Sequence, residues 1–141
     1  MTMEKKKIMI VEDSNAMRLI IRNMINTNPN LMVVKTASNG LEALDLLPTC
    51  EPDLILLDLE MPEMGGLEFL RQARLKTRAK IVVLSSVVPS GSPAANQARA
   101  LGADGVICKP SGSVSYDLED KRGSEFWSTL HKLLGIEVTA A

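Results

Sequence analysis

The sequence predicts an α/β fold, a doubly wound five-stranded parallel sheet with the strand order 2-1-3-4-5. Two observations predict it: five short apolar runs, and helical apolar patterns in the intervals that follow them. The runs are continuous rather than alternating, which is typical of strands buried on both faces. Right-handed crossovers leave few topologies for such a chain. We adopt the strand order common to small doubly wound sheets rather than deriving it.

The apolar runs mark the expected strands. Four of them are clear, at residues 8–11, 54–57, 81–84 and 106–108. A fifth run, at 31–34, is weaker. All five are three or four residues long, and two are rich in β-branched residues, which favours strands over helices.

Helical periodicity follows the first two runs along the chain, at 8–11 and 31–34. The first helix is expected behind Ser14 as its N-cap, with apolar residues at helical spacing at Met17, Ile20, Ile21, Met24 and Ile25. The second is expected behind Asn39-Gly40, with Leu41, Leu44 and Leu47 on its apolar face. Pro48 is expected to end that helix.

Three further helices complete the alternation. The third has its apolar residues within 67–74, and the fourth is an alanine-rich pattern within 94–101 that Gly102 closes. The last spans the pattern at 126–134 and is followed by Gly135. One of Phe126 and Trp127 is expected to pack inward. Strand and helix therefore alternate five times, as a doubly wound sheet requires.

Composition narrows the possible functions. The chain has 141 residues, about one domain, and a formal net charge of −1. It carries no basic surplus that would predict binding to nucleic acid or to an anionic membrane. Neither a signal peptide nor a membrane span is recognisable, so a cytoplasmic location is expected. Of the two cysteines, Cys108 is expected to be a small core residue.

The single histidine, His131, excludes a zinc site built from several histidines. It lies on the helical pattern near the C-terminus. We therefore expect it to be a surface helix residue.

Polar residues stand where four of the expected strands end. Glu12-Asp13 follow the first strand, and Asp58 follows the third. Ser85-Ser86 follow the fourth, and Lys109-Pro110 follow the fifth. The functional crevice of such folds lies beyond the carboxyl ends of the strands, so these groups are expected to converge there.

Three converging carboxylates need a cation among them. Two unit charges about 4 Å apart repel by about 4 kcal/mol at an effective dielectric of about 20. Lys109 supplies one positive charge, and the surplus favours Mg²⁺, a hard cation that prefers oxygen ligands. Asp58 beside Mg²⁺, an ammonium and the Ser85 hydroxyl is arranged to become an acyl phosphate, with Asp58 as the nucleophile.

These motifs together resemble the receiver domains of two-component response regulators, which have the flavodoxin-like fold. The resemblance rests on Glu12-Asp13, Asp58 closing a buried strand, Met61-Pro62 with Gly65-Gly66, Ser85, and Lys109-Pro110. It covers residues 6–134, which we expect to form the domain, with terminal extensions at 1–5 and 135–141. The segment from Lys109 to Gly112 is most similar to the receiver half of chemotaxis methylesterase regulators of the CheB type.

The resemblance implies a role for each site residue. Asp58 would be the phosphoacceptor, Asp13 a direct Mg²⁺ ligand and Glu12 its partner carboxylate, with the main-chain carbonyl of Glu60 as a further ligand. Ser85 would follow the phosphoryl group during switching. Lys109 would pair with the phosphate, with a cis peptide expected before Pro110.

The resemblance also implies partners. A sensor histidine kinase would donate the phosphoryl group, and a downstream protein or an attached output domain would read the change. No direct contact with nucleic acid or membrane is expected. The domain would catalyse only its own Mg²⁺-dependent phosphorylation and dephosphorylation. The segment 111–123 is either a surface connector or a contact specific to a partner, and chemotaxis is a possible setting.

Two features depart from the family pattern. Many members have an aromatic residue three positions before the lysine, where this chain has Val106. The interval from Ser85 to Lys109 is also longer than in many receivers. No Gly-x-Ser-x-Gly elbow of a methylesterase is present, and the chain is too short for a second catalytic domain.

Three other functions are consistent with parts of the pattern. An aspartate-nucleophile phosphohydrolase commonly uses a second Asp two positions on, where this chain has Glu60. A flavodoxin-type cofactor binder needs a phosphate loop after the first strand, and Glu12-Asp13 would repel a phosphate there. A receiver used only for docking usually lacks the acceptor or the lysine, and both are present.

Overall fold

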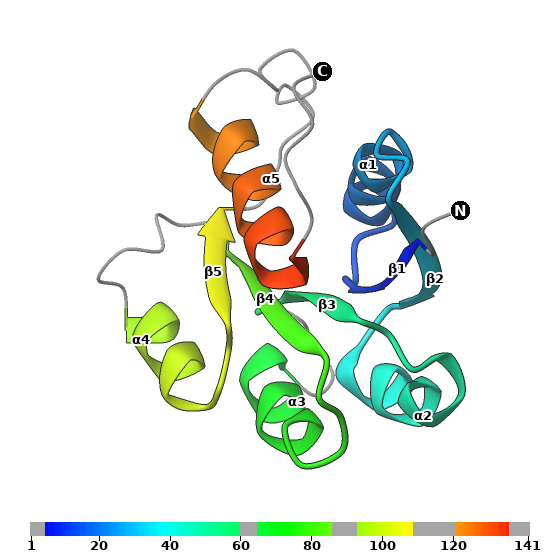
Figure 1. Cartoon of the computed structure of the whole chain (residues 1–141). Coiled ribbons are helices and arrows are strands. Elements are labelled where there is room, and N and C mark those ends of the chain that lie inside the picture. The colour runs from blue at the N-terminus through cyan, green and yellow to red at the C-terminus, as the bar shows by residue number, and fades with distance from the viewer. Residues whose placement is uncertain (1–4, 60–64, 86–92, 109–120, 136–141) are drawn as a thin grey trace.

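The computed structural model describes residues 5–59, 65–85, 93–108 and 121–135. Within the last of these ranges, side chains are described from Phe126 onward. Figure 1 shows a central sheet with helices on both of its faces. The helices and strands alternate along the chain as β1 (Lys6–Val11), α1 (Asn15–Asn26), β2 (Leu31–Ala37), α2 (Gly40–Cys50), β3 (Leu54–Asp58), α3 (Gly66–Ala73), β4 (Lys80–Ser85), α4 (Pro93–Ala100), β5 (Gly105–Cys108) and α5 (Lys121–Leu134).

The strands form one sheet in the order β2-β1-β3-β4-β5, and every neighbouring pair is parallel. The predicted fold class and strand order are therefore confirmed. In this order β1 and β3 are neighbours, with the crossovers diverging to either side of them. The carboxyl ends of β1 and β3 consequently lie side by side at the switch point of the sheet.

Each central strand contributes to two cores. Met9 and Val11 of β1 belong to the cluster under α2, α3 and α4, and Ile8 and Ile10 belong to the cluster under α1 and α5. All four side chains are fully buried. The same alternation continues through β3 and β4. Burial on both faces explains why the apolar runs in the sequence are continuous.

Several elements extend beyond their sequence patterns, among them α5, which begins at Lys121 rather than at Phe126. The edge strand β2 continues to Ala37 rather than ending at Val34, with a register shift opposite Ile8 and Met9. Its second half was missed because a strand at the edge alternates polar and apolar residues. The helix α2 runs through Pro48 to Cys50, so the expectation that Pro48 ends it was wrong.

The packing of α2 explains this continuation. Leu44 and Leu47 are buried, and the Glu51 N–H donates to the Leu47 carbonyl at 3.1 Å, which secures the last turn. Pro48 is exposed, and it costs the helix the hydrogen bond that its N–H would have made. Leu41, placed on the apolar face from the sequence, is 53% exposed because the buried stripe passes through Ala43 instead.

His131 corrects another expectation. It is buried, with 6% of its surface exposed, rather than a surface residue of α5. Its Nε2 atom lies 3.0 Å from Nδ2 of Asn28, in the connection between α1 and β2. The neighbouring Trp127 is half-buried, with its ring 5.9 Å from the imidazole, whereas Phe126 packs inward as expected of one of the two aromatic residues.

Across the described ranges, no helix is both long and apolar enough to span a membrane. Cys50 is half-buried with a free thiol, and burial raises its pKa. Cys108 ends β5, and its side chain lies outside the described residues.

Candidate functional site

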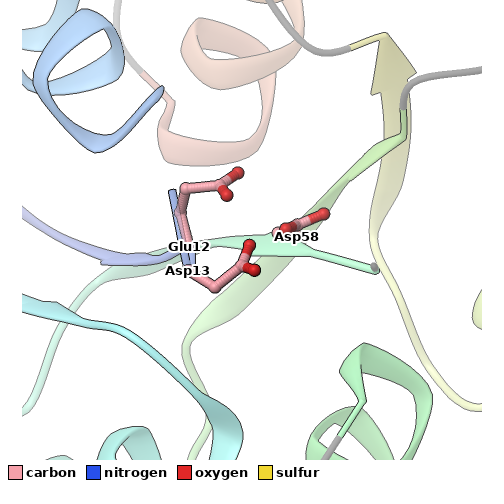
Figure 2. A group of neighbouring side chains, drawn as sticks. All are labelled: Glu12, Asp13 and Asp58. Atoms are coloured by element: carbon pink, nitrogen blue, oxygen red, sulfur yellow. The ribbon is translucent and has the colours of Figure 1, made fainter. Parts of the chain in front are cut away.

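Three carboxylates meet at the carboxyl ends of β1 and β3. Glu12 and Asp13 follow β1, and Asp58 is the last residue of β3. One oxygen from each carboxylate lies within 4.8 Å of the other two. Glu12 and Asp58 are fully buried, while Asp13 is exposed. Figure 2 shows the three side chains together. The convergence predicted from the sequence is therefore present in the described part of the site.

Glu12 is held at three of its atoms. Its main-chain N–H donates to the Ala37 carbonyl of β2 at 2.9 Å. Its Oε2 atom accepts from the Ser14 N–H at 3.0 Å, and its main-chain carbonyl accepts from Nη1 of Arg18 at 2.7 Å. The Ser14 side chain caps α1 by accepting from the Met17 N–H, as predicted. The end of β1 and the start of α1 thus form one hydrogen-bonded unit.

Gly66 packs closely against the main chain of Asp58 and Leu59. A Cβ atom at this position would come within 2.6 Å of the Asp58 carbonyl oxygen and 2.7 Å of the Leu59 Cα. Any larger residue would therefore push α3 away from the end of β3. The Gly65-Gly66 pair, which the sequence analysis named only as part of the family resemblance, sets how closely α3 begins behind the end of β3.

Ser85 ends β4, where Leu84 is paired with Asp58 of the neighbouring strand. It is nearly fully buried, with 4% exposed, and it is paired with Cys108 at the end of β5. Its position at the end of β4, the strand next to β3, is the one expected from the sequence, and its role stays a prediction. Val106 is buried in β5, where an aromatic residue often stands in the family.

Several predicted site residues lie outside the described residues. These are Glu60, Lys109, Pro110 with its expected cis peptide, and most of the segment 111–123. Lys109 directly follows Cys108, the last residue of β5, in the sequence. Their proposed roles remain predictions.

The donor chemistry of the cluster fits a hard divalent cation. Its described ligands are three carboxylates, all of them oxygen donors, and two of these carboxylates are fully buried. Buried carboxylates this close to one another are costly unless positive charge is placed among them. Mg²⁺ is bound in proteins by one or two carboxylates with several waters, and the exposed Asp13 leaves one side of the cluster open to water.

The sequence reasoning missed Arg18. Its guanidinium reaches back from α1 to the Glu12 carbonyl, and it also donates to Oδ1 of Asn15. A signal was present, because a positive side chain in the first turns of a helix opposes the helix dipole and needs a reason.

The chain matches the response regulator receiver domain family over residues 8–115. A protein-glutamate methylesterase/protein-glutamine glutaminase of Halalkalibacterium halodurans is 42% identical over 116 residues, which are 82% of this chain and 34% of that protein. A similar enzyme of Treponema pallidum is 44% identical over 112 residues, 79% of this chain and 28% of that protein. The chain therefore spans about a third of the length of these relatives.

Solved structures show the same likeness. A chain in the crystal structure of the P1 domain of CheA3 in complex with CheY6 from R. sphaeroides superposes with a TM-score of 0.79 at 53% identity, covering 94% of this chain and 99% of that one. The response regulator domain of Thermotoga maritima CheB gives 0.81 at 27% identity, covering 96% and 100%. Fold, acidic cluster and sequence likeness agree, and the chain belongs to the response regulator receiver domain family, the phosphoacceptor domains of two-component signalling.

Proposed function

We propose that Asp58 is the phosphoacceptor and that a histidine kinase is the donor. The observation that carries the proposal is the fully buried Asp58 carboxylate at the end of β3, within 4.8 Å of Glu12 and Asp13. A carboxylate in this position is an oxygen nucleophile, and the two carboxylates beside it could hold a cation that stabilises the transferred phosphoryl group. The family to which the chain belongs uses such a carboxylate to form an acyl phosphate.

Glu12, Asp13 and Asp58 are the residues that would hold Mg²⁺, with the main-chain carbonyl of Glu60 as a further ligand. When bound, the metal neutralises charge on the phosphoryl oxygens. Glu12 contributes charge from a buried position fixed by hydrogen bonds, whereas Asp13 contributes from the exposed side. We assign Asp13 to direct coordination and Glu12 to coordination through water.

In the proposed reaction an oxygen of Asp58 attacks the phosphorus atom of a phosphohistidine. The new O–P bond forms as the N–P bond breaks, and the electron pair of that bond, with a proton from solvent, passes to the imidazole. The Ser85 hydroxyl donates a hydrogen bond to one phosphoryl oxygen, and the Lys109 ammonium pairs with another. Attack of water on phosphorus later breaks the same O–P bond and returns the carboxylate.

The proposed donor is the phosphohistidine domain of a chemotaxis-type kinase. The R. sphaeroides structure holds a P1 domain of CheA3 in complex with CheY6, and a chain in that structure is 53% identical to this one. The relatives named as protein-glutamate methylesterases are matched over only about a third of their length. The output is therefore assigned only as a downstream protein or an attached domain that reads the phosphorylated state.

Intact-mass spectrometry after incubation with acetyl phosphate tests the proposal. We expect one added phosphoryl group in the wild type, only when Mg²⁺ is present, and none in Asp58→Asn. Asp53→Asn is the matched control, because Asp53 precedes the same strand at its opposite end and should leave the adduct unchanged. A donor domain carrying phosphohistidine replaces acetyl phosphate in a second series. No adduct from either donor would favour a receiver used only for docking.

A further inference from the structure

We propose that Arg18 is a positioning residue that fixes the Glu12 carboxylate in the acidic cluster. The inference deepens the proposed function and rests on it, because the property that Arg18 would control is the binding of Mg²⁺. Its direct observation is the 2.7 Å hydrogen bond from Nη1 of Arg18 to the main-chain carbonyl of Glu12. Arg18 touches neither a reacting atom nor a carboxylate ligand in the described contacts, so it would act through Glu12.

The placement of Arg18 needs an explanation. It stands four residues beyond the N-cap Ser14, and its main-chain N–H donates to the Ser14 carbonyl, within the first turns of α1. A cation there opposes the positive end of the helix dipole. Its guanidinium is nevertheless fixed by two acceptors, the Glu12 carbonyl and Oδ1 of Asn15. A planar guanidinium with several donors is suited to bridging two acceptors in this way.

The hydrogen bond from Arg18 affects the orientation of Glu12. Two of the bonds to Glu12 are made by main-chain groups, the Ala37 carbonyl and the Ser14 N–H. The bond from Arg18 is the one among these three that a side chain supplies. It fixes the peptide plane between Glu12 and Asp13, and the directions of both carboxylates depend on that plane. Loss of the bond should therefore loosen the turn that presents two of the three described carboxylates.

Positioning and simple charge make opposite predictions. A cation beside an acidic cluster repels Mg²⁺, so removing its charge alone should strengthen Mg²⁺ binding. Removing a residue that orients metal ligands should weaken it, commonly by tenfold or more. The sign of the change in affinity therefore separates the two accounts without reference to activity.

The test is a thermal unfolding series against Mg²⁺ concentration at constant ionic strength, with a parallel series in EDTA. The rise in melting temperature with Mg²⁺ gives its Kd, because the ion binds only the folded cluster. Arg18→Gln removes the cationic donor, while Arg22→Gln removes a charge from the exposed face of the same helix, one turn further on. The EDTA series reports any loss of stability that is unrelated to the metal.

We expect Arg18→Gln to weaken Mg²⁺ binding about tenfold, and Arg22→Gln to bind as tightly as the wild type or more tightly. A Kd for Arg18→Gln that is no weaker than that of the wild type overturns the inference and leaves the proposed function intact. A wild type that does not respond to Mg²⁺ instead contradicts the proposed metal site itself. If Arg18→Gln is unfolded in EDTA, Arg18→Met takes its place, because it keeps the apolar stem and lacks any donor, and wild-type affinity in that variant likewise overturns the inference.

Discussion

The carboxylates at the two ends of the sheet have opposite surroundings. At the amino ends of the strands, Asp53 accepts the Lys7 N–H at 2.7 Å, and Asp104 accepts both the Ile81 N–H at 2.9 Å and the Arg74 guanidinium at 3.3 Å. Each of these carboxylates accepts hydrogen bonds from other parts of the chain and so joins them. At the carboxyl ends, three carboxylates crowd within 4.8 Å of one another.

The difference separates stability from function within one fold. A carboxylate that is matched to main-chain donors pins neighbouring elements together and contributes to stability. Carboxylates that crowd together raise the free energy of the folded state unless a cation lies among them. Substitutions at the two ends should therefore have opposite effects on stability.

The largest effect is expected at Asp104. Its loss leaves the Ile81 N–H and the Arg74 guanidinium without this acceptor, and both groups are at least partly buried. Asp104→Ala should lower the free energy of unfolding by about 2–3 kcal/mol, measured by urea denaturation. The phosphoryl adduct should still form below the unfolding transition. The exposed Arg71–Glu68 pair supplies the control, since Glu68→Gln should leave the urea midpoint unchanged.

The opposite sign is expected at Asp58. In EDTA, Asp58→Asn removes one of the crowded charges and should raise the free energy of unfolding, on the order of 1–2 kcal/mol. Addition of Mg²⁺ at 100 times its Kd should raise the free energy of unfolding of the wild type by about 2.7 kcal/mol. The same addition should raise that of the variant by less. Thermal unfolding with and without the metal measures both quantities. A lower free energy of unfolding for Asp58→Asn than for the wild type in EDTA would contradict the proposed difference between the two ends of the sheet.

A smaller, pH-dependent effect is expected at His131, in the contact between α5 and the α1–β2 connection. Oδ1 of Asn28 accepts the Asn30 N–H at 2.9 Å, so the amide presents its NH₂ group to Nε2 of His131. Nε2 must then be an acceptor, and the imidazole is neutral. Burial lowers the pKa of His131 below its usual range.

The sign of the pH effect follows from this lowered pKa. In the unfolded chain the imidazole gains a proton near pH 6.5, while in the folded chain it stays neutral to lower pH. The free energy of unfolding should therefore fall as the pH drops below about 6.5, and it should level off below the folded pKa. Urea denaturation at several pH values measures this slope, and His131→Leu should remove its share of it.

Asn28→Asp should reverse the contribution of His131. A carboxylate beside the imidazole would stabilise the charged form and raise its pKa. That contribution would then be present below the unfolded pKa and be lost as the pH rises through the folded one. An Asn28→Asp variant with the same slope as the wild type would show that this contact does not control the charge of His131.

The fold could be predicted because its signals are local and repeated. Burial of β1, β3 and β4 on both faces leaves continuous apolar runs, and Ser14 and Asn39 mark the starts of two helices. The second half of β2 was less visible, since an edge strand is only half covered. The passage of α2 through Pro48 depends on tertiary packing of Leu44 and Leu47, which outweighs local preference.

The acidic cluster could be predicted for a different reason. Parallel strands bring their carboxyl ends to one edge, so Glu12, Asp13 and Asp58 had to meet once the strand order was adopted. The bond from Arg18 to the Glu12 carbonyl and the burial of His131 against Asn28 could not be predicted. Each joins a side chain to a group on a separate element or connection, and the periodicity of one helix carries no information about such a partner.

The most direct test of the account is to identify the phosphorylated residue chemically. Borohydride reduces an acyl phosphate to the corresponding alcohol, so a phosphorylated aspartate becomes homoserine, which peptide mass spectrometry can locate. After phosphorylation in Mg²⁺, the account predicts homoserine at position 58, and none when Mg²⁺ is withheld. Homoserine at position 13 or 53 with Asp58 unchanged would contradict the assignment of the buried carboxylate at the end of β3 as the acceptor.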